Sequence, residues 1–406
     1  MKRFPRLPFI TSLLLLVAAP AMAQTPEDQA SRLIDRGLEF LKTQQQEDGS
    51  WQPDPRVPPA LTALPLRAFV GSDRYTPDDE LIRKGYEALI AQQVADGGIY
   101  EDLLANYNTA IAVSALAAAN QEAGDDRYRE SMDRAVAYLR RLQWTPETDP
   151  EYAQDEPGEE GRVSGEEDPF FGGWGYGGRS RGAGRPDLSN AQMALEALHD
   201  AGVSSDDPAF QRALKFVSRL QNHSETNPAD WAGDDGGFVY GPSADRRGES
   251  QAGEYTTPSG QRRLRSYGSM TYAGLKSMIY AGLEKEDPRV QAAWDWITSN
   301  WTLDENPGMA AGNPENADAG LYYYYLTLAR ALNAYDQPVI DTPQGKVDWR
   351  LALIEKLGEL QNEDGSWTGN RRWMEDDPVL VTSYVVIALE NALEDLRQHP
   401  PEETRE

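Results

Sequence analysis

The chain has 406 residues, with 39 Lys and Arg against 66 Asp and Glu, and its formal net charge is −27. Such an acidic chain repels phosphate backbones, which excludes the nucleic-acid-binding class. The absence of Cys excludes disulfides, thiolate nucleophiles, thioesters and Cys-based zinc sites. Because 39% of the residues are hydrophobic and 10 are Trp, the chain can bury a large core and is not a disordered acidic protein.

The first residues have the pattern of a targeting signal. A basic start is followed by an apolar run over residues 10–19 and by small residues near 21–23. The run is too short to span a bilayer, so we predict a signal peptide at residues 1–23 and an exported mature chain, periplasmic or extracellular. No later segment reaches about 18 consecutive apolar residues, so the mature chain is not expected to span a membrane.

A repeated frame runs through the rest of the chain. Its first copy, residues 36–51, contains a basic residue, a small residue and an aromatic–aliphatic pair, followed by Gln45, Gly49 and Trp51. The other copies lie at 84–99, 134–174 (interrupted by an insertion), 212–238, 293–301 in degenerate form, and 361–367. The small and aromatic–aliphatic positions share one helix face, Gln can bond free backbone groups at a helix end, and Gly accepts a turn conformation. Each copy therefore predicts the end of one helix, a glycine turn and the start of another helix.

An apolar segment follows each turn, and these segments predict the inner layer of a ring. They are apolar almost all round, as buried helices are, whereas the helices before the turns carry a charged face. The six segments are 61–70, 107–119, 188–199, 269–283, 320–333 and 381–394. We therefore predict an all-α, two-layered ring of twelve helices over residues 24–396, with a central cavity. Insertions lie at about 145–186 and 223–265, and a charged tail follows at 397–406.

The frame resembles the QW repeat of the prenyltransferase and squalene-cyclase superfamily over nearly all of the mature chain. The resemblance implies that superfamily's fold, an (α/α)6 toroid. Squalene-hopene-type cyclases carry an Asp-x-Asp-Asp-Thr-Ala motif at the head of an inner helix. Here Asp187 matches the first Asp, but Ser189 and Asn190 replace the other two. The superfamily's prenyltransferases hold zinc partly through Cys, which this chain lacks, so we expect no metal and no cofactor.

Carboxylates near aromatic residues are the candidate catalytic groups. Asp187 heads an inner helix, and Asp234 and Asp235 lie between aromatic residues of the 223–265 insertion. Paired carboxylates can act as acid and base, or bind a cation or a sugar. Structural alternatives remain: Asp187 or Ser189 can cap the helix, and Asp235 sits at the turn position of the repeat.

Aromatic and polar residues near the heads of the inner helices and in the insertions are the candidate ligand-binding residues. A ring lined by Tyr offers an amphipathic pocket for an apolar or sugar-like ligand, and a basic group beside a helix start can assist anion binding. The candidates are Trp174, Tyr176, Asn190, Trp231, Tyr267, Tyr272, Tyr323, Arg265, Asp376 and Asp377. Asp376 and Asp377, together with the preceding Glu375, can equally serve as N-terminal caps.

Three functions from different classes are open at this point. The one we favour, on the resemblance and the aromatic cavity, is binding of an apolar isoprenoid-like ligand, with or without its transformation; a transforming enzyme would be a divergent terpene cyclase or isomerase. The second is a glycan-active enzyme that uses carboxylates such as Asp187 and Asp234. The third is an interaction scaffold whose 145–170 insertion, with ten acidic residues and one basic residue, contacts a protein partner.

Overall fold

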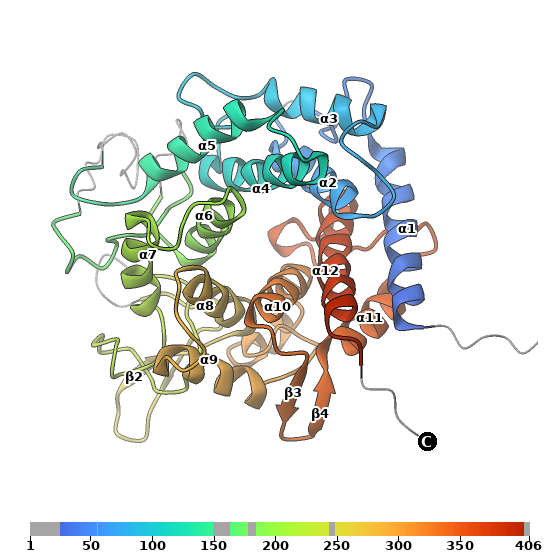
Figure 1. The fold of residues 1–406 in the computed structure, drawn as a ribbon. Helices are drawn as coiled ribbons and strands as arrows, with labels where there is room; N and C mark the ends of the chain where they lie inside the picture. The colour runs from blue at the N-terminus through green and yellow to red at the C-terminus, as the bar shows by residue number, and fades with distance from the viewer. Residues whose placement is uncertain (1–24, 55, 149–162, 178–183, 243–247, 402–406) are drawn as a thin grey trace, which may run out of the picture.

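The structure is a computed structural model that describes residues 25–54, 56–148, 163–177, 184–242 and 248–401. The predicted signal peptide, the middle of the acidic insertion and the end of the tail lie outside the described residues. Within the described part, twelve α-helices form two concentric layers around one axis (Figure 1). The prediction of an all-α toroid is confirmed.

Every second helix belongs to the inner layer. The inner helices are α2 (Ala60–Gly71), α4 (Ala105–Ala123), α6 (Leu188–Asp200), α8 (Gly268–Tyr280), α10 (Leu321–Tyr335) and α12 (Pro378–Gln398). The outer helices are α1 (Pro26–Gln44), α3 (Glu80–Ile90), α5 (Arg129–Leu142), α7 (Pro208–Ser218), α9 (Pro288–Ser299) and α11 (Trp349–Leu360). Each inner helix packs on the next, and α12 packs on both α1 and α2, which closes the ring (Figure 1).

The Gln of the repeat joins each helix end to the next outer helix. The side-chain amide of Gln143 donates one hydrogen bond to the carbonyl of its own turn residue Gly172 and one to the carbonyl of Ala209 in α7, both at 2.9 Å. Four more repeats use the same pair of bonds, through Gln45, Gln93, Gln221 and Gln361. The last of them reaches α1, so the bond that links neighbouring repeats also links the two ends of the ring.

The turn glycine is required on two counts. Gly97 has a φ of 96°, a left-handed conformation that side chains disfavour, and a Cβ at this position would lie 2.6 Å from the carbonyl oxygen of Arg134. The aromatic residue that follows covers the junction. For example, the indole N–H of Trp174 donates to the carbonyl of Leu139 at the end of the preceding outer helix, at 2.7 Å. The frame is therefore a set of interlocking contacts between adjacent repeats.

Aspartates and prolines define where several helices begin. The side chains of Asp207, Asp287 and Asp377 each accept a backbone N–H from the first turn of α7, α9 and α12, and Pro follows each of them at the first helical position. This is the preferred start of a helix, since Asp satisfies a free N–H and Pro lacks one.

Two short antiparallel hairpins interrupt the helical pattern, and the sequence analysis did not predict them. β1 (Glu254–Thr256) pairs with β2 (Arg262–Leu264) in the second insertion, and β3 (Val339–Thr342) pairs with β4 (Gly345–Asp348) between α10 and α11. Short 3-10 helices lie at Met309–Ala311, Pro314–Asn316 and Arg372–Met374. No helix in the described ranges is long and apolar enough to cross a bilayer.

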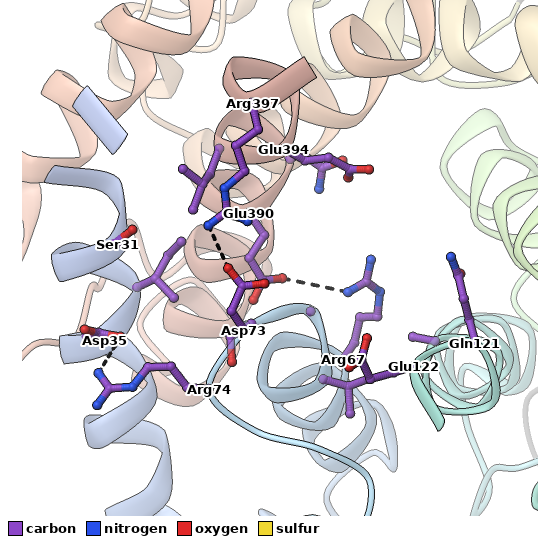
Figure 2. Close-up of a pocket in the computed structure, with 17 residues that line it drawn as sticks. Ser31, Asp35, Arg67, Asp73, Arg74, Gln121, Glu122, Glu390, Glu394 and Arg397 are labelled. Atoms are coloured by element: carbon purple, nitrogen blue, oxygen red, sulfur yellow. Dashed lines mark hydrogen bonds and ion pairs between the residues drawn. The ribbon is translucent and has the colours of Figure 1, made fainter. Parts of the chain in front are cut away.

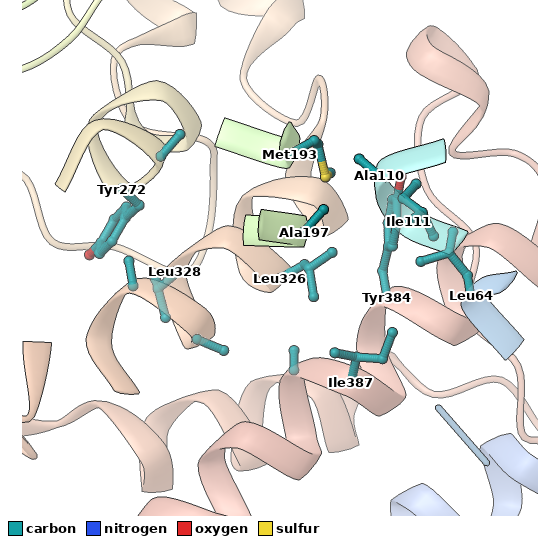
Figure 3. Close-up of a cluster of buried hydrophobic side chains, with 14 of the residues drawn as sticks. Leu64, Ala110, Ile111, Met193, Ala197, Tyr272, Leu326, Leu328, Tyr384 and Ile387 are labelled. Carbon is teal, nitrogen blue, oxygen red and sulfur yellow. The ribbon is translucent and has the colours of Figure 1, made fainter. Parts of the chain in front are cut away.

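The ring has a cavity at each end and a packed centre between them. One cavity lies where the inner helices begin, and a second, lined largely by charged side chains, lies where α2, α4 and α12 end (Figure 2). Between them, side chains from the inner helices converge, including Leu64, Ile111, Met193, Leu326 and Tyr384 (Figure 3). All five are buried, and the cavity that remains among four of them has a volume of only about 20 Å³, so this core separates the two larger cavities.

Candidate functional site

The cavity at the start of the inner helices has a volume of about 530 Å³. All six inner helices contribute to it from their first two turns, for example through Leu61 of α2, Tyr107 of α4 and Tyr323 of α10. Loops that precede inner helices supply the remaining wall, including Tyr176 and Trp373. This volume lies within the usual range for a small-molecule site.

The wall of this cavity is apolar and aromatic. Among the described residues that line it are ten apolar side chains, six tyrosines, four neutral polar side chains and one carboxyl group, that of Glu375. Burial raises the pKa of Tyr107 and Tyr267 well above the ordinary value, and that of Tyr323 to about 12, so these hydroxyls stay neutral. The chemistry of the cavity therefore depends on the charge of Glu375.

Glu375 caps an inner helix from a distant loop. Its Oε1 accepts the backbone N–H of Tyr323 at 2.8 Å, and the N–H groups of Leu321 and Tyr322 also point at this carboxyl. Its Oε2 is buried and has no hydrogen-bond partner. Burial raises the pKa of Glu375 to about 8, although the three N–H groups lower it. At pH 7 the carboxyl is therefore mostly protonated, and it lines the cavity as a neutral acid.

A chain of hydroxyls crosses the cavity wall between three inner helices. The hydroxyl of Tyr107 bonds Ser189, whose Oγ lies 2.9 Å from the hydroxyl of Tyr323. The amide of Gln192 donates to the same Tyr323 hydroxyl at 2.9 Å, and its own Oε1 is buried without a partner. These bonds hold the tyrosines in fixed positions and leave polar atoms among apolar surfaces.

A second hydrogen-bonded chain leads from the cavity to Asp187. The hydroxyl of Tyr176 lies 2.5 Å from that of Tyr240, which in turn bonds the Asp187 carboxylate. Asp187 caps α6, because its carboxylate accepts hydrogen bonds from the backbone N–H of Asn190 at 2.8 Å and from the side-chain amide of Asn190 at 2.7 Å. Burial raises the pKa of Asp187 to about 7 in spite of these donors. Asp187 does not line the cavity but communicates with it through the two tyrosines.

The mouth of the cavity contains strained backbone. Leu104, Trp373 and Met374 have φ values of 55°, 58° and 66°, in the left-handed region that non-glycine residues rarely occupy. All three line the cavity, and the side chains of Trp373 and Met374 are 47% and 45% exposed. Such strain tends to gather at functional sites, where the surrounding structure maintains it. The combination of strain and exposed apolar surface makes this opening a candidate functional site.

The structure brings together some of the predicted site residues and separates others. Tyr176, Tyr267 and Tyr323 line the central cavity, and Asp187 and Asn190 lie directly behind its wall. The other candidates lie outside the lining: Trp174, Trp231, Tyr272, Asp234, Asp235, Arg265, Asp376 and Asp377. Of these, Trp174 covers a repeat junction and Tyr272 packs edge-on against Tyr324 between helices.

The candidates of the second insertion have structural partners. Asp235 accepts the backbone N–H of Gly237 at 3.0 Å and the Ser266 hydroxyl at 2.7 Å, as a turn residue does. Asp234 accepts the N–H of Ser224 at 2.8 Å, and hydrogen bonds from the side chain and the backbone of Ser224 lower the pKa of Asp234. Trp231 contributes to a separate surface pocket, and the Arg265 guanidinium lies 5.1 Å from the ring centre of Tyr255.

The two aspartates before the last inner helix also have local partners. Asp377 is the N-cap of α12, and Asp376 pairs at its surface with Arg371 at 3.6 Å. Their neighbour Glu375 is the residue that reaches the cavity, and the sequence analysis grouped it with the helix-capping acids. Five further residues of the cavity and its hydrogen-bonded chains were not named as site residues from the sequence: Tyr107, Ser189, Gln192, Tyr240 and Tyr384. Tyr107 and Ser189 occupy the first turn of an inner helix, a position that would have identified them.

No metal-binding group is evident in the described part of the chain, where no three His, Asp or Glu side chains are clustered as metal ligands would be. The few His residues lie at or near helix ends, and His199 stacks on Tyr280 with ring centres 3.9 Å apart. What the cavity itself offers is hydrophobic contact, tyrosine hydroxyls and one neutral acid.

Solved structures share this fold at low sequence identity. A variant of the type II terpene cyclase MstE from Scytonema is 14% identical with a TM-score of 0.54, and the match covers 91% of this chain and 99% of that one. An unsaturated glucuronyl hydrolase specific for heparin is 13% identical with a TM-score of 0.54 over 92% and 98%. An α-1,6-mannanase of Salegentibacter sp., in complex with α-1,6-mannotriose, is 11% identical with a TM-score of 0.52 over 90% and 99%.

The sequence matches no known family and no curated protein. The similar structures show the toroid fold, which hosts both terpene cyclases and glycan-active enzymes. Proteins that share such a fold differ in function through the residues of their sites. The residues of the cavity must therefore distinguish between a terpene-binding and a glycan-active protein.

Proposed function

We propose that this protein binds an apolar, isoprenoid-like ligand in the central cavity. The observation that carries the proposal is the neutral wall, in which apolar side chains and tyrosines surround a single carboxyl group that is protonated at pH 7. Burial of apolar ligand surface against such a wall drives binding, and the tyrosine rings add polarisable contact. The Ser189 and Tyr323 hydroxyls can position one polar group of the ligand.

A glycan-active enzyme is the second candidate, and the acids of the site favour it. Glu375 and Asp187 both have raised pKa values, and glycosidases use one protonated and one ionised carboxyl group on opposite sides of the bond that they cleave. Only one of the two lines the cavity, however, because Tyr240 stands between Asp187 and the open space. Two amide side chains line the wall, but Asn108 is bonded to the backbone of Ala60 and Leu103. The Oε1 of Gln251 accepts a hydrogen bond from Arg372. We therefore place the apolar ligand first.

The two candidates are separated by titrating the mature protein with farnesol and with a mannose oligosaccharide, using the fluorescence of the tryptophans. We expect saturable binding of farnesol at one site and none of the oligosaccharide. Ala60→Phe, which puts a ring into the cavity, should weaken farnesol binding by about tenfold or more, whereas Ala118→Phe at the opposite end of the ring is the matched control. Saturable oligosaccharide binding that Ala60→Phe abolishes would overturn the proposal.

Transformation of the ligand is a separate question, and Glu375 is the group that would carry it. A neutral carboxyl beside apolar surface can donate a proton to an alkene or to a leaving group, and its conjugate base can take one back. Incubation of the protein with farnesol, followed by gas chromatography, tests for turnover. Any product should disappear in Glu375→Gln, while farnesol binding persists.

We also propose, from the sequence, that the protein acts outside the cytoplasm and that its acidic insertion contacts a protein partner. N-terminal sequencing of the protein from its native host would locate the cleavage, which we expect after Ala23. An intact N-terminus on the functional protein would contradict export.

Deletion of residues 149–162 should abolish binding of the protein partner to the acidic insertion.

A further inference from the structure

A second cavity, of about 510 Å³, lies at the end of the ring where α2, α4 and α12 terminate, and α1 forms its outer side (Figure 2). Its chemistry is opposite to that of the central cavity. Among the described residues, five carboxylates and three guanidinium groups line it, which leaves a formal excess of two negative charges. The core shown in Figure 3 lies between the two cavities.

Most charges near the rim are already paired. Arg74 bonds Asp35 at 2.6 Å, and Arg397 bonds Asp73 at 2.6 Å (Figure 2). Their side chains are about half exposed, so these pairs contribute little to stability and mainly shape the entrance. The pairs account for two of the three guanidinium groups and leave the deepest carboxylate to the third.

Glu390 is that deepest carboxylate, and its hydrogen-bonding capacity is unused. Its side chain is 9% exposed, and neither of its two oxygens has a hydrogen-bond partner. Arg67 approaches to only 3.8 Å, which is an ion pair without a hydrogen bond (Figure 2). Buried carboxylate oxygens in folded proteins are normally satisfied, so two oxygens without a hydrogen bond on a residue that lines a cavity indicate that a donor belongs there.

The backbone beside Glu390 lies directly against its carboxyl group. Gly71, the last residue of α2, stands where a Cβ would collide with the Glu390 carboxylate and lie 2.6 Å from the Arg67 guanidinium. Its backbone has no left-handed φ that would by itself require glycine. The absence of a side chain at this position is therefore explained by the close approach of the charged groups.

The protonation of Glu390 also shows that charge compensation is missing. Burial raises its pKa to about 8, and the nearby Arg67 and Arg330 only partly offset this effect. An added cation within hydrogen-bonding distance would favour the ionised form and bring the pKa back down. Binding would then release a proton at neutral pH.

We propose that this cavity binds a small organic cation whose primary ammonium or guanidinium N–H groups donate to the two free oxygens of Glu390. The negative excess of the lining attracts the cation, and the unused oxygens supply its acceptors. The site is independent of the ligand proposed for the central cavity, because the packed core lies between them.

Isothermal titration of the mature protein with 1,4-diaminobutane tests this proposal, with its fully N-methylated analogue as a control of equal charge. We expect saturable binding of the diamine and at least about tenfold weaker binding of the analogue, which has no N–H donor. Titration in two buffers of different ionisation enthalpy should show proton release near neutral pH. Equal binding of the two dications, or binding of neither, would overturn the proposal.

Two variants locate the site. Glu390→Gln removes the acceptor charge and should weaken diamine binding by about tenfold or more, whereas Glu355→Gln, exposed on the outer helix α11 and outside the cavity, should change it by less than about threefold. If Glu390→Gln fails to fold, Gly71→Ala places a methyl group against the Glu390 carboxylate and displaces its oxygens, which should weaken binding in the same way. Unchanged binding in a folded variant of either residue would overturn the proposal. A lysine-containing peptide that binds more tightly than the free diamine would also overturn it, because the cation would then be a protein side chain.

Discussion

Replacing Glu375 by Gln tests whether the central cavity is neutral at physiological pH. Gln has the shape of the protonated acid: its Oε1 can still accept the N–H of Tyr323, and its amide takes the place of the unpartnered Oε2. The variant therefore mimics the neutral state and cannot ionise. A difference between the two proteins that changes with pH reports the titration of this one group.

The sign and size of that difference follow from the raised pKa. Glu375 titrates at about 8 in the folded protein and near 4.5 in the unfolded chain, so between these values the folded state holds a proton that the unfolded state has released. The free energy of unfolding of the wild type, measured against the variant, is therefore highest below pH ~4.5 and falls by ~1.4 kcal/mol per pH unit up to pH ~8. Between pH ~5.5 and pH ~7.5 the difference should change by about 3 kcal/mol.

Urea denaturation of both proteins at the two pH values measures this quantity. Asp376→Asn is the matched control, because Asp376 is the exposed neighbour of Glu375 and its replacement should give no such slope. The infrared band of a protonated carboxyl group, present in the wild type at pH 7 and absent from Glu375→Gln, is an independent measurement. Parallel pH profiles of wild type and variant would show that Glu375 is ionised when folded, and the case for a neutral cavity would fail with it.

Three further changes test the ring itself. Gly236→Ala should lower the free energy of unfolding by more than ~2 kcal/mol, since its Cβ would collide with the backbone of α9, whereas Gly202→Ala, also left-handed but in open space, should cost ~1 kcal/mol. Gln143→Ala removes a buried amide from two carbonyls and should cost about 2 kcal/mol in denaturant titration. Arg350→Leu leaves a buried carboxylate unpaired and should cost about 3 to 5 kcal/mol, against less than ~0.5 kcal/mol for the exposed Arg371→Leu. Equal denaturation midpoints for Gly236→Ala and Gly202→Ala, or for Arg350→Leu and Arg371→Leu, would contradict the contacts assigned to Gly236 and Arg350. An unchanged denaturation midpoint for Gln143→Ala would contradict the two hydrogen bonds assigned to Gln143.

The ring could be predicted from the sequence because the residues that connect neighbouring repeats recur along the chain. The Gln and Gly of the repeat recur four residues apart, as in Gln45 and Gly49, except where an insertion separates them, and each serves a backbone contact that any neighbouring repeat can supply. Contacts to backbone do not depend on which side chains a repeat carries, so they survive as a pattern even where the rest of the repeat has changed. The hairpins that begin with Val339–Thr342 and Glu254–Thr256 lie outside this pattern, and no periodic feature of the sequence predicts them.

The site could be predicted in part, at inner-helix starts and at Tyr176 of the first insertion. Tyr267 and Tyr323 were found because they stand at the head of apolar segments. Glu375 was missed because an Asp-Pro start follows it, and local spacing assigns all acids there to capping. Its actual role depends on the left-handed residues Trp373 and Met374, which turn the chain back toward the start of α10, and on the free backbone N–H groups there. Glu375 and Tyr323 are 52 residues apart, and a contact between such distant segments does not produce a periodic pattern in the sequence.

Both cavities are lined by residues that the repeat frame does not use. Its conserved elements in this chain, such as Gln143 and Gly97, lie at the outer junctions, whereas Glu375 comes from a loop and Glu390 from the end of an inner helix. Substitutions at either end of the ring can therefore change a ligand without disturbing the bonds that close the toroid. The acids illustrate this separation: one oxygen of Glu375 and both oxygens of Glu390 are buried without a hydrogen-bond partner, which is costly unless a ligand compensates it. A functional role explains these buried acids better than a structural one.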